Sequence, residues 1–361
     1  MYNNNEQSII WFSMFDFMTS KKIEEVLNFY DSPSDILSIG LIEEIENVVG
    51  KENFSKLKEK YDKNLLSSYI SALEKDDIKC VTMYSNEYPK KLKELESPPY
   101  ILFCKGDLSL LSSNCFAIVG TRTPSSYGKV VTQNFAKGLA ENGFTIVSGL
   151  AMGVDKIAHE TALDVKGKTI AVLGGGFNHI YPAMNENLAA LISKNGLLVS
   201  EYRPSVHPTA YNFPVRNRII AGLTCGILIT EAGEKSGALH TKEYALECGR
   251  DVFAIPANIT SAKSAGTNRL LKSMQSALVT NYEDILQTYN ISKKKVNKQS
   301  KQLSFNEQII INSLQDEQLS LDEIQFKTGL DIKILNSCLT TLQISGLIKK
   351  LPGNEYILCG Q

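Results

Sequence analysis

The sequence predicts an α/β protein whose centre is a doubly wound parallel sheet, and three features of residues 115–256 lead to this prediction. Short apolar runs recur along the segment, as in FAIVG at 116–120 and GILITEAG at 226–233. Amphipathic helical patterns of 10–15 residues separate these runs. Each run ends in a loop with a glycine, a small polar residue or a charge. Apolar strands that alternate with helices are typical of parallel sheets covered on both faces.

Six strands are expected in this segment, at 116–120, 144–149, 168–176, 197–202, 226–233 and 251–256. Residues 1–100 precede them and show short amphipathic helices, for example 21–30 and 53–75. An edge strand is expected at 100–104, where the chain enters the sheet. We therefore expect an all-helical first domain over 1–100 and an α/β domain over 101–290.

Beyond the α/β segment, residues 291–303 contain five lysines and no acidic residue, which predicts a polar linker. Residues 304–361 then show three short helical patterns and a hairpin with a Pro-Gly-Asn turn. The helices are expected at 305–314, 320–329 and 331–345. Three helices followed by a β-wing indicate a winged-helix-like domain.

The composition is that of a globular protein with more than one domain, because the chain has 361 residues, 43% of them hydrophobic and 21% charged. No apolar run reaches the ~18–20 residues that a membrane span needs, and the start of the chain lacks the pattern of a signal peptide. Seven scattered cysteines without a CxxC pair fit a reducing compartment and argue against zinc. We expect a cytoplasmic protein with no membrane insertion, no metal and no cofactor.

The net charge of −1 is unevenly distributed along the chain. Residues 1–100 hold 12 Lys and Arg against 18 Asp and Glu, residues 101–290 hold 17 against 14, and residues 304–361 hold 4 against 7. An anion-binding surface is therefore expected in the middle segment. The acidic flanks are expected to bind DNA poorly. The expected recognition helix of the last domain carries one cation, Lys333, which favours a protein-contact or regulatory role.

Basic residues gather in the loops that follow the expected strands. Because the carboxyl ends of parallel strands meet at one edge of a sheet, these loops are expected to converge. Glycine-rich turns also let backbone N–H groups approach a phosphate at a helix N-terminus. The loops therefore predict an anion-binding trough along one edge of the sheet. Its expected cations are Arg122, Arg203, Arg216, Arg218 and Lys235.

Familiar nucleotide-binding and hydrolase motifs are not met. GKT at 167–169 lacks the first glycine of a Walker A loop and precedes a strand instead of following one, so an NTPase is not expected. The first turn, GTRTPSSYG, lacks the G-x-G-x-x-G spacing, and the second strand ends in Ser148 and Gly149 rather than an acid, which argues against NAD. No G-x-S-x-G elbow is present in the sequence.

Four titratable residues in these loops each have two interpretations. Asp155 and His159 lie four apart and could share a metal, although a helix-surface pair or a packed histidine is the commoner meaning of that spacing. Glu201 and Glu231 close two of the strands. They could act as acid and base, or they could orient the arginines by hydrogen bonding.

Aromatic residues share the loops with the cations. Aromatic faces beside phosphate-binding cations are typical of single-stranded nucleic-acid sites, where each stacked base contributes roughly 1–3 kcal/mol. Any one of them could instead fix a loop onto a helix. As a set they favour a strand of nucleic acid, and they are Tyr127, Phe177, Tyr181, Tyr202, Tyr211 and Phe213.

The blocks GTRTPSSYG, SGLAMGVDKIAH, FPVRNRIIAG and EAGEKSGALHT lie within residues 110–275 and resemble, in order, those of the bacterial DprA or Smf family. The resemblance implies an extended Rossmann-like fold with a SAM-like or helix-hairpin-helix-like first domain and a winged-helix-like last domain. It also implies sequence-independent binding of single-stranded DNA (ssDNA), protection of incoming DNA and loading of the RecA recombinase during natural transformation. A homodimer without enzymatic activity is implied as well.

The resemblance also assigns the site block by block. Arg122 matches the family's phosphate-contacting arginine, Arg216 lies in the FPxRNR block and Lys235 opens the KSG block. No catalytic residue is implied. The expected ssDNA- or phosphate-binding residues are Thr121, Arg122, Ser125, Tyr127, Gly128, Ser148, Gly149, Gly174, Gly175, Gly176, Phe213, Arg216, Asn217, Arg218, Lys235, Ser236 and Gly237.

The FPxRNR block also places two cations where a helix disfavours them. Arg216 and Arg218 are expected in the opening turn of a helix, where the helix dipole costs a cation roughly 0.3–1 kcal/mol. DNA phosphates would neutralise both arginines there. The alternative is that they pair with Glu201 or Glu231.

A rival hypothesis is an enzyme. Nucleotide phosphoribohydrolases of the lysine-decarboxylase-like family also use glycine-rich turns around a nucleotide phosphate, and they carry PGGxGTxxE. This chain has EAGEKSGALHTKE in the comparable place. Glu243 echoes the last position of that motif, but PGG is absent.

Overall fold

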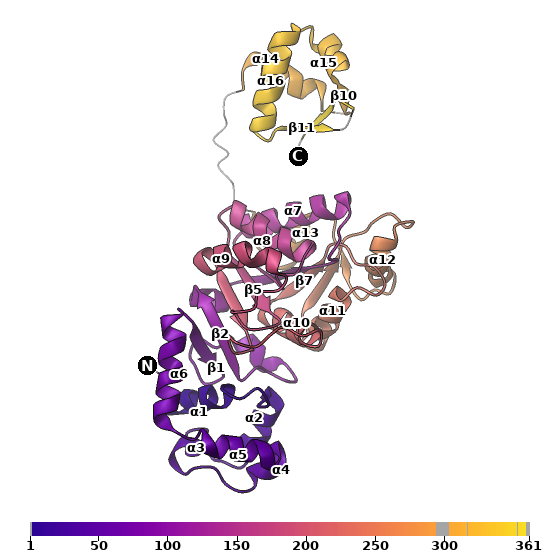
Figure 1. Cartoon of the computed structure of the whole chain (residues 1–361). Coiled ribbons are helices and arrows are strands. Elements are labelled where there is room, and N and C mark those ends of the chain that lie inside the picture. The colour runs from indigo at the N-terminus through magenta and orange to yellow at the C-terminus, as the bar shows by residue number, and fades with distance from the viewer. Residues whose placement is uncertain (1, 294–302, 316, 352, 359–361) are drawn as a thin grey trace. The chain divides into compact units, whose positions relative to one another are not determined.

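The computed structural model describes residues 2–293, 303–315, 317–351 and 353–358. It divides into two compact units, the first ending at residue 294 and the second beginning at residue 295 (Figure 1). This division falls within the segment predicted to be a linker, most of which lies outside the described residues.

A nine-stranded sheet forms the centre of the first unit in the described part of the chain, in the order β1-β2-β6-β5-β4-β3-β7-β8-β9. Strand β2 pairs antiparallel with both β1 and β6, whereas the pairs from β6 to β9 are parallel. The strands are β1 Lys79–Thr82, β2 Ile101–Gly106, β3 Cys115–Val119, β4 Thr145–Ser148, β5 Thr169–Leu173, β6 Leu197–Ser200, β7 Gly226–Ile229, β8 Asp251–Ala254 and β9 Ala277–Leu278.

The six strands predicted from apolar runs are confirmed as β3 to β8. Every residue of β3 and β5 is buried, which explains why their sequences are continuously apolar rather than alternating. From β3 the chain builds the sheet outward to β6 and then returns to the other side of β3 as β7. The strand order therefore reverses between β3 and β7, and ligands of doubly wound sheets bind in the crevice at such a point.

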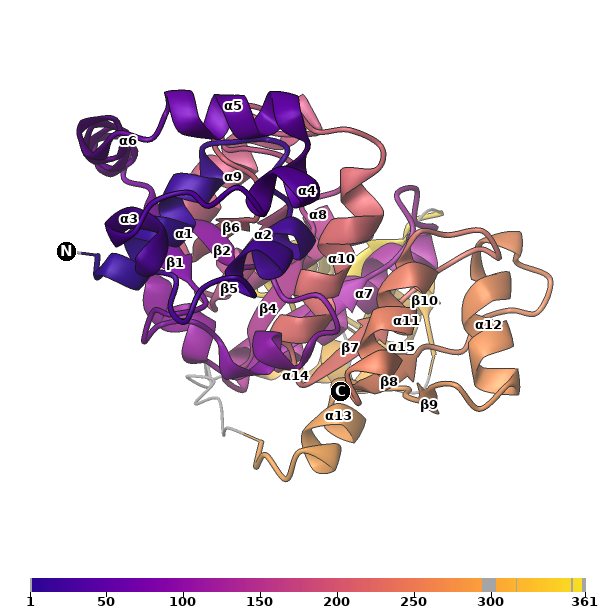
Figure 2. The ribbon, with the colours of Figure 1, turned by 90° about the horizontal axis from the view of Figure 1, so that it is seen from below.

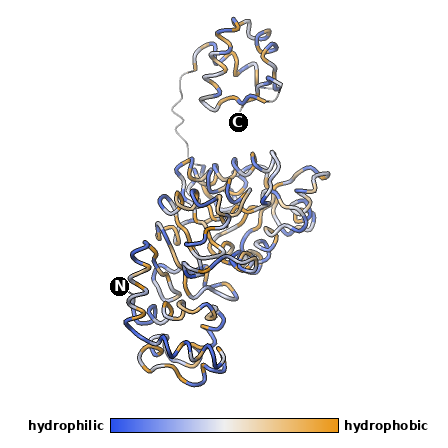
Figure 3. Tube along the Cα trace, viewed as in Figure 1, coloured by the Kyte–Doolittle hydropathy of each residue, from blue (hydrophilic) through white to orange (hydrophobic). Residues whose placement is uncertain are grey.

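Helices cover both faces of the sheet, in three layers (Figure 1). One face packs against α7, α8, α9 and α13 and the other against α10 and α11. Along these helices the trace alternates between hydrophilic and hydrophobic residues (Figure 3), as expected for helices that bury one side. Their bounds are α7 Ser126–Glu141, α8 Val154–Asp164, α9 Glu186–Asn195, α10 Asn212–Leu223, α11 Ala238–Glu247 and α13 Tyr282–Thr288.

The N-terminal helices lie at the β1–β2 end of the sheet, and α12 Ala265–Lys272 lies at the opposite end (Figure 2). The hydrophobic core of the N-terminal helices, around Trp11 and Phe12, continues onto Ile101 and Phe103 of β2. Helices and sheet thus belong to one compact unit, with no division at the boundary predicted near residue 100. The helices are α1 Asn4–Ser13, α2 Ser20–Leu27, α3 Asp35–Ser38, α4 Ile45–Val49, α5 Lys51–Glu59 and α6 Lys63–Lys75.

Three details of this region differ from the sequence-based expectation. The pattern at 53–75 is two helices, because Asp62 caps α6 with a bond from the Asn64 N–H at 2.8 Å. The first hundred residues also contain β1, so they are not all helical. Strand β1 therefore takes the edge position expected for the strand at 100–104, and β2 lies one place further in.

The second unit has the predicted winged-helix layout. Its sheet has the order β10-β12-β11, and its core includes Ile310, Leu335 and Leu342. The elements are α14 Phe305–Ser313, β10 Leu319–Ser320, α15 Leu321–Thr328, α16 Ile332–Ile344, β11 Ile348–Leu351 and β12 Glu355–Leu358. Among the described helices of either unit, none is long and apolar enough to cross a membrane.

Candidate functional site

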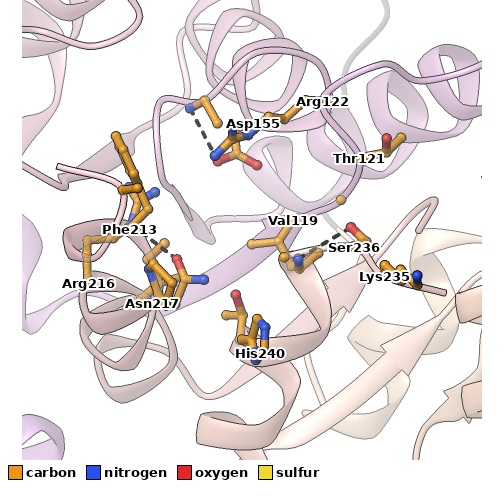
Figure 4. A pocket seen from close by; sticks show the side chains of 18 of the residues that line it. Val119, Thr121, Arg122, Asp155, Phe213, Arg216, Asn217, Lys235, Ser236 and His240 are labelled. Atoms are coloured by element: carbon orange, nitrogen blue, oxygen red, sulfur yellow. Dashed lines mark hydrogen bonds between the residues drawn. The ribbon is translucent and has the colours of Figure 1, made fainter. Parts of the chain in front are cut away.

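A pocket of about 860 Å³ opens where the strand order reverses (Figure 4). Val119 and Gly120 reach it from the end of β3, and Gly233 reaches it from the loop after β7. Ile220 of α10 and seventeen residues from five loops and the helices that follow them complete the lining. These seventeen are Thr121, Arg122, Ala151, Asp155, Tyr181, Pro208, Ala210, Phe213, Pro214, Arg216, Asn217, Lys235, Ser236, Gly237, Ala238, His240 and Thr241. The predicted convergence of loops at one sheet edge is therefore present.

Arg122 extends from the loop that joins β3 to α7. Its side chain is exposed, and its Cζ atom lies 5.8 Å from the centroid of the Phe213 ring. Within the described part of the chain it has no carboxylate partner. The Thr121 N–H donates to the carbonyl of Glu231 at 2.7 Å, and Lys263 Nζ donates to the carbonyl of Thr123 at 2.8 Å. Arg122 is thus an unpaired cation on a loop fixed by its neighbours.

Arg216 lies in the second turn of α10 and is buried, with 4% of its surface exposed. Its Nη1 donates to the carbonyl of Gly149 at 2.6 Å and to the carbonyl of Val172, at the carboxyl ends of β4 and β5. A Cβ at position 149 would clash with the guanidinium, so the glycine permits this approach. Burial lowers the pKa of Arg216 to about 10. The side chain nevertheless lines the pocket, so its charge reaches any anion there.

Asp155 lies on the pocket wall (Figure 4), and both Asp155 and Arg216 bind the backbone of Gly149. Its Oδ2 accepts hydrogen bonds from the N–H groups of Gly149 at 3.0 Å and Ala151 at 3.4 Å. Burial raises the pKa of this carboxyl, and the nearby Arg216 charge opposes that rise. The Arg216 charge therefore favours the ionised form of Asp155.

His159 is a packed histidine rather than a metal ligand. Its Nδ1 lies 2.6 Å from Oγ1 of Thr169, and the ring is fully buried. Burial, with a smaller contribution from Arg216, lowers the pKa of His159 to about 3. No group of three or more metal-ligating side chains is found among the described residues.

Lys235 lies across the pocket from Phe213 and Arg216 (Figure 4). It belongs to the loop between β7 and α11, and its side chain is exposed. Ser236 follows it and accepts a bond from the Ala238 N–H at 3.4 Å, at the start of α11. Lys235 also has no carboxylate partner among the described residues. The two unpaired cations, Arg122 and Lys235, both lie on the pocket wall.

The aromatic residues divide into two groups. Phe213 lies between Arg122 and Arg216, and its ring centroid is 5.4 Å from that of Tyr181, which is 54% exposed. These two rings form an aromatic wall in the pocket. Phe177 instead packs against the hydrophobic cores. Tyr127 donates its hydroxyl to the carbonyl of Pro256 at 2.8 Å, outside the pocket.

Comparison with known proteins places this chain in a family. The sequence profile described as "DNA recombination-mediator protein A" matches residues 79–290. The chain belongs to this family. A second profile, the DprA winged helix domain, matches residues 297–354.

Relatives of the DprA family cover most of the chain. DNA processing protein DprA of Bacillus subtilis is 41% identical over 223 residues, which cover 62% of this chain and 75% of that protein. Protein Smf of Escherichia coli is 37% identical over 305 residues, 81% of each chain.

Two solved DprA structures share the fold. The X-ray structure from Streptococcus pneumoniae has a TM-score of 0.67 at 37% identity and covers 79% of this chain and 98% of its own. The structure from Helicobacter pylori, whose title describes a single-stranded DNA binding mode, has a TM-score of 0.54 at 35% identity and covers 59% and 96%.

The DprA-type FPxRNR block does not place both arginines in the pocket. Arg218 donates from Nη2 to both carboxylate oxygens of Glu201 at 2.6 Å, and its side chain is 9% exposed. Of the two alternatives for Arg218, the structure shows the pair with Glu201. Residues two apart lie on different sides of a helix, so Arg216 and Arg218 cannot share one pocket.

Arg203 is also neutralised within this DprA-family chain. Its Nε and Nη2 donate to the carboxylate of Asp16 in the N-terminal helices at 2.6 and 2.5 Å. Glu201, two residues before Arg203, accepts a hydrogen bond from Ser20 Oγ at 2.7 Å as well as those from Arg218. Glu201 therefore orients an arginine, as one of its two interpretations predicted.

Several glycine and serine positions predicted from the DprA-type blocks lie outside the pocket lining. Ser148 donates its hydroxyl to the carbonyl of Ile118 at 2.7 Å inside the sheet. Gly174, Gly175 and Gly176 lie against Phe213, Pro208 and Pro204, so these glycines let the loops that follow β5 and β6 pack closely. Ser125 and Tyr127 line a separate pocket of about 400 Å³.

The sequence does not predict two parts of the pocket lining. The spacing of Asp155 and His159 predicts a shared metal or a helix-surface pair, whereas Asp155, in the first turn of α8, instead accepts loop N–H groups. Pro208 and Ala210 carry no chemical signal that could have marked them. Glu243, which matches the last position of the rival hydrolase motif, is exposed and does not line the pocket. Its Oε2 lies 3.3 Å from Nδ1 of His240.

Proposed function

We propose that this chain binds single-stranded DNA without sequence preference and holds its phosphates between Arg122, Arg216 and Lys235. The observation that carries the proposal is the pocket at the switch point, with two unpaired cations and a buried third cation beside an aromatic wall. The ssDNA-binding mode described for the H. pylori relative, at 35% identity, supports the same conclusion.

The residues that line the pocket favour a flexible strand over a duplex. Tyr181 is 54% exposed and offers a ring face on which an unstacked base can stack, and stacking tolerates any base because every base has a π-face. Duplex DNA keeps its bases stacked on one another and cannot use such a wall. Phosphates would contribute the larger and salt-dependent part of the affinity.

We propose binding rather than catalysis as the role of the site. Glu201 is bonded to Arg218 and Ser20, and Glu231 is bonded to Ser125, so the two carboxylates at strand ends hold neighbouring groups in place. Asp155 is held by two backbone N–H groups next to Arg216. In line with the resemblance to the DprA family, we propose that the chain protects incoming ssDNA and loads the RecA recombinase in the cytoplasm, acting as a homodimer.

The remaining predicted contacts enter the same proposal. Thr121, Asn217, Ser236 and Gly237 line the pocket and would supply uncharged hydrogen bonds to the sugar–phosphate strand. The first helical region and the winged-helix unit, both acidic in sequence, would contact protein partners rather than DNA.

Fluorescence anisotropy of the whole chain with labelled ssDNA and with duplex, each at two salt concentrations, tests this function. We expect tighter binding to ssDNA, with an affinity that falls as salt rises. Equal affinity for oligonucleotides of different base composition would support sequence independence. Absence of ssDNA binding at low salt would overturn the proposal.

A further inference from the structure

Glu231 is a buried carboxylate that follows β7, with 1% of its surface exposed. Its Oε2 accepts the backbone N–H of Ser125 at 2.7 Å. Its Oε1 accepts the hydroxyl of Ser125 at 2.7 Å and that of Ser264 at 3.4 Å. These donors are uncharged, so the carboxylate is held by hydrogen bonds rather than by an ion pair.

The same residue holds both ends of the loop that carries Arg122. The Thr121 N–H donates to the backbone carbonyl of Glu231 at 2.7 Å, and Ser125 binds its carboxylate at the other end. Arg122 lies between these two attachments. The direction of the Arg122 side chain therefore depends on Glu231, which follows β7, the strand on the other side of the point where the strand order reverses.

The Glu231 carboxylate also lies at the N-terminus of α7, the 16-residue helix that follows the first parallel strand. In α/β folds that bind nucleotides, the phosphate lies at such an N-terminus because unpaired N–H groups and the helix dipole attract an anion. Here Gly128 in the first turn leaves room for Glu231, since a Cβ at that position would clash with the carboxylate oxygen. The chain thus supplies its own anion to this position.

We propose that Glu231 is a positioning residue for ssDNA binding: its carboxylate takes the place of a phosphate at the N-terminus of α7 and fixes the loop 121–125 so that Arg122 faces the pocket. The inference rests on the proposed function, because it names what orients one of the phosphate contacts. On this proposal a ligand phosphate would bind on the Arg122 side of this loop.

Long-range electrostatics and loop positioning predict opposite changes in ssDNA affinity when Glu231 is neutralised, so an affinity measurement distinguishes them. Removing a negative charge near a DNA site should strengthen binding if only long-range electrostatics matter. Removing the group that holds the Arg122 loop should weaken binding. The experiment therefore measures ssDNA affinity of the whole chain with Glu231→Gln and with the matched control Glu234→Gln, an exposed carboxylate in the same loop.

We expect Glu231→Gln to weaken ssDNA binding by about tenfold and to lower the slope of log K against log salt by about 0.7, the value for one lost single-strand phosphate contact. Glu234→Gln should leave the affinity unchanged or slightly tighter. Arg122→Ala made in the Glu231→Gln background should cost much less than in the wild type, because coupled residues are not additive.

A second variant keeps the test valid if Glu231→Gln does not fold. Gly128→Ala adds a methyl group that displaces the carboxylate while the charge is unchanged, and alanine favours a helix more than glycine does. It should weaken ssDNA binding in the same way. If the wild type binds ssDNA but the folded variants bind as tightly or more tightly, or add fully to Arg122→Ala, this inference is wrong. A wild type that does not bind ssDNA refutes the proposed function instead.

Discussion

Arg218 and Glu201 form a buried ion pair in which one guanidinium nitrogen donates to both carboxylate oxygens at 2.6 Å. Ser20 of the N-terminal helices donates to the same carboxylate at 2.7 Å. The pair therefore connects α10, the end of β6 and the N-terminal helices. It serves the architecture around the pocket, whereas Arg216, two residues earlier, reaches the pocket itself.

Arg218→Ala should destabilise the first unit by about 3 kcal/mol, the lower end for a buried pair, because it leaves the partly buried carboxylate of Glu201 without its cation. The ssDNA affinity of the folded variant should stay within about threefold of the wild type. Urea denaturation followed by tryptophan fluorescence measures the first unit alone, since Trp11 is the single tryptophan of the chain and is buried there. Loss of affinity without loss of stability would mean that Arg218 contacts DNA.

Arg122→Ala and Lys235→Ala should each weaken ssDNA binding by about tenfold, or about 1.4 kcal/mol. The reason is that neither cation on the pocket wall has a carboxylate partner among the described residues, so both charges can contact phosphate. Anisotropy titrations over a range of salt should show each variant losing about 0.7 from the slope. Lys137→Ala, at an exposed position of α7 outside the pocket lining, serves as the control and should bind normally.

Stability should fall with acid through His159. Burial lowers the pKa of this histidine from 6.5 to about 3, so below pH 6.5 the unfolded chain takes up a proton that the folded chain does not. The stabilising contribution is present above pH 6.5 and is lost as pH falls toward 3, at about 1.4 kcal/mol per pH unit. Burial raises the pKa of Asp155, so its contribution to the free energy of unfolding has the opposite sign and falls as pH rises.

His159→Gln separates the two residues in the same denaturation experiment. The variant should be less stable than the wild type at pH 7, because the packed ring is lost. The difference should narrow by about 2 kcal/mol at pH 5, since glutamine does not titrate. A difference that is constant between pH 7 and pH 5 would contradict the buried neutral histidine.

Termination of the chain after residue 293 should leave ssDNA affinity within about threefold of the whole chain. The pocket is formed entirely by the first unit, and residues 304–361 carry 4 basic against 7 acidic residues. The anisotropy assay with the truncated and whole chains checks this. A large loss of affinity would show that the winged-helix unit takes part in DNA binding.

Incubation with AMP should release no adenine. The PGG segment of the rival hydrolases is absent, Glu243 lies outside the pocket lining, and Glu231 is engaged with Ser125. Chromatography of the reaction mixture after long incubation measures free base directly. Adenine release that disappears in a Glu231→Gln variant would instead support the enzyme hypothesis.

The fold was predictable where its signals are local. Strands β3 to β8 are continuous apolar runs, because parallel strands are buried on both faces. Strands β1 and β9 have four and two residues and lack that pattern, so they were missed. Capping by Asp62, which divides one long helical pattern into two helices, depends on a single side chain.

The site was predictable as a set of loops but not as a set of contacts. The positions of Arg122, Phe213, Arg216 and Lys235, in the loops and helix starts that follow the strands, are expected from strand order, and all four line the pocket. The helical period of about 3.6 residues already implies that Arg218 and Arg216, two positions apart, point to different sides of the helix. Contacts such as Glu231 with Ser125 join positions that are 106 residues apart, and no local pattern announces them.

The N-terminal helices have a consequence for how this chain can be divided into fragments. A fragment that began at residue 101 would lose β1, and β2 would then carry an open row of backbone donors and acceptors. Ile101 and Phe103 would lose the helical core that covers them, and Arg203 would lose Asp16. Such a fragment should self-associate through its bare strand, whereas one that retains the first hundred residues should stay dispersed.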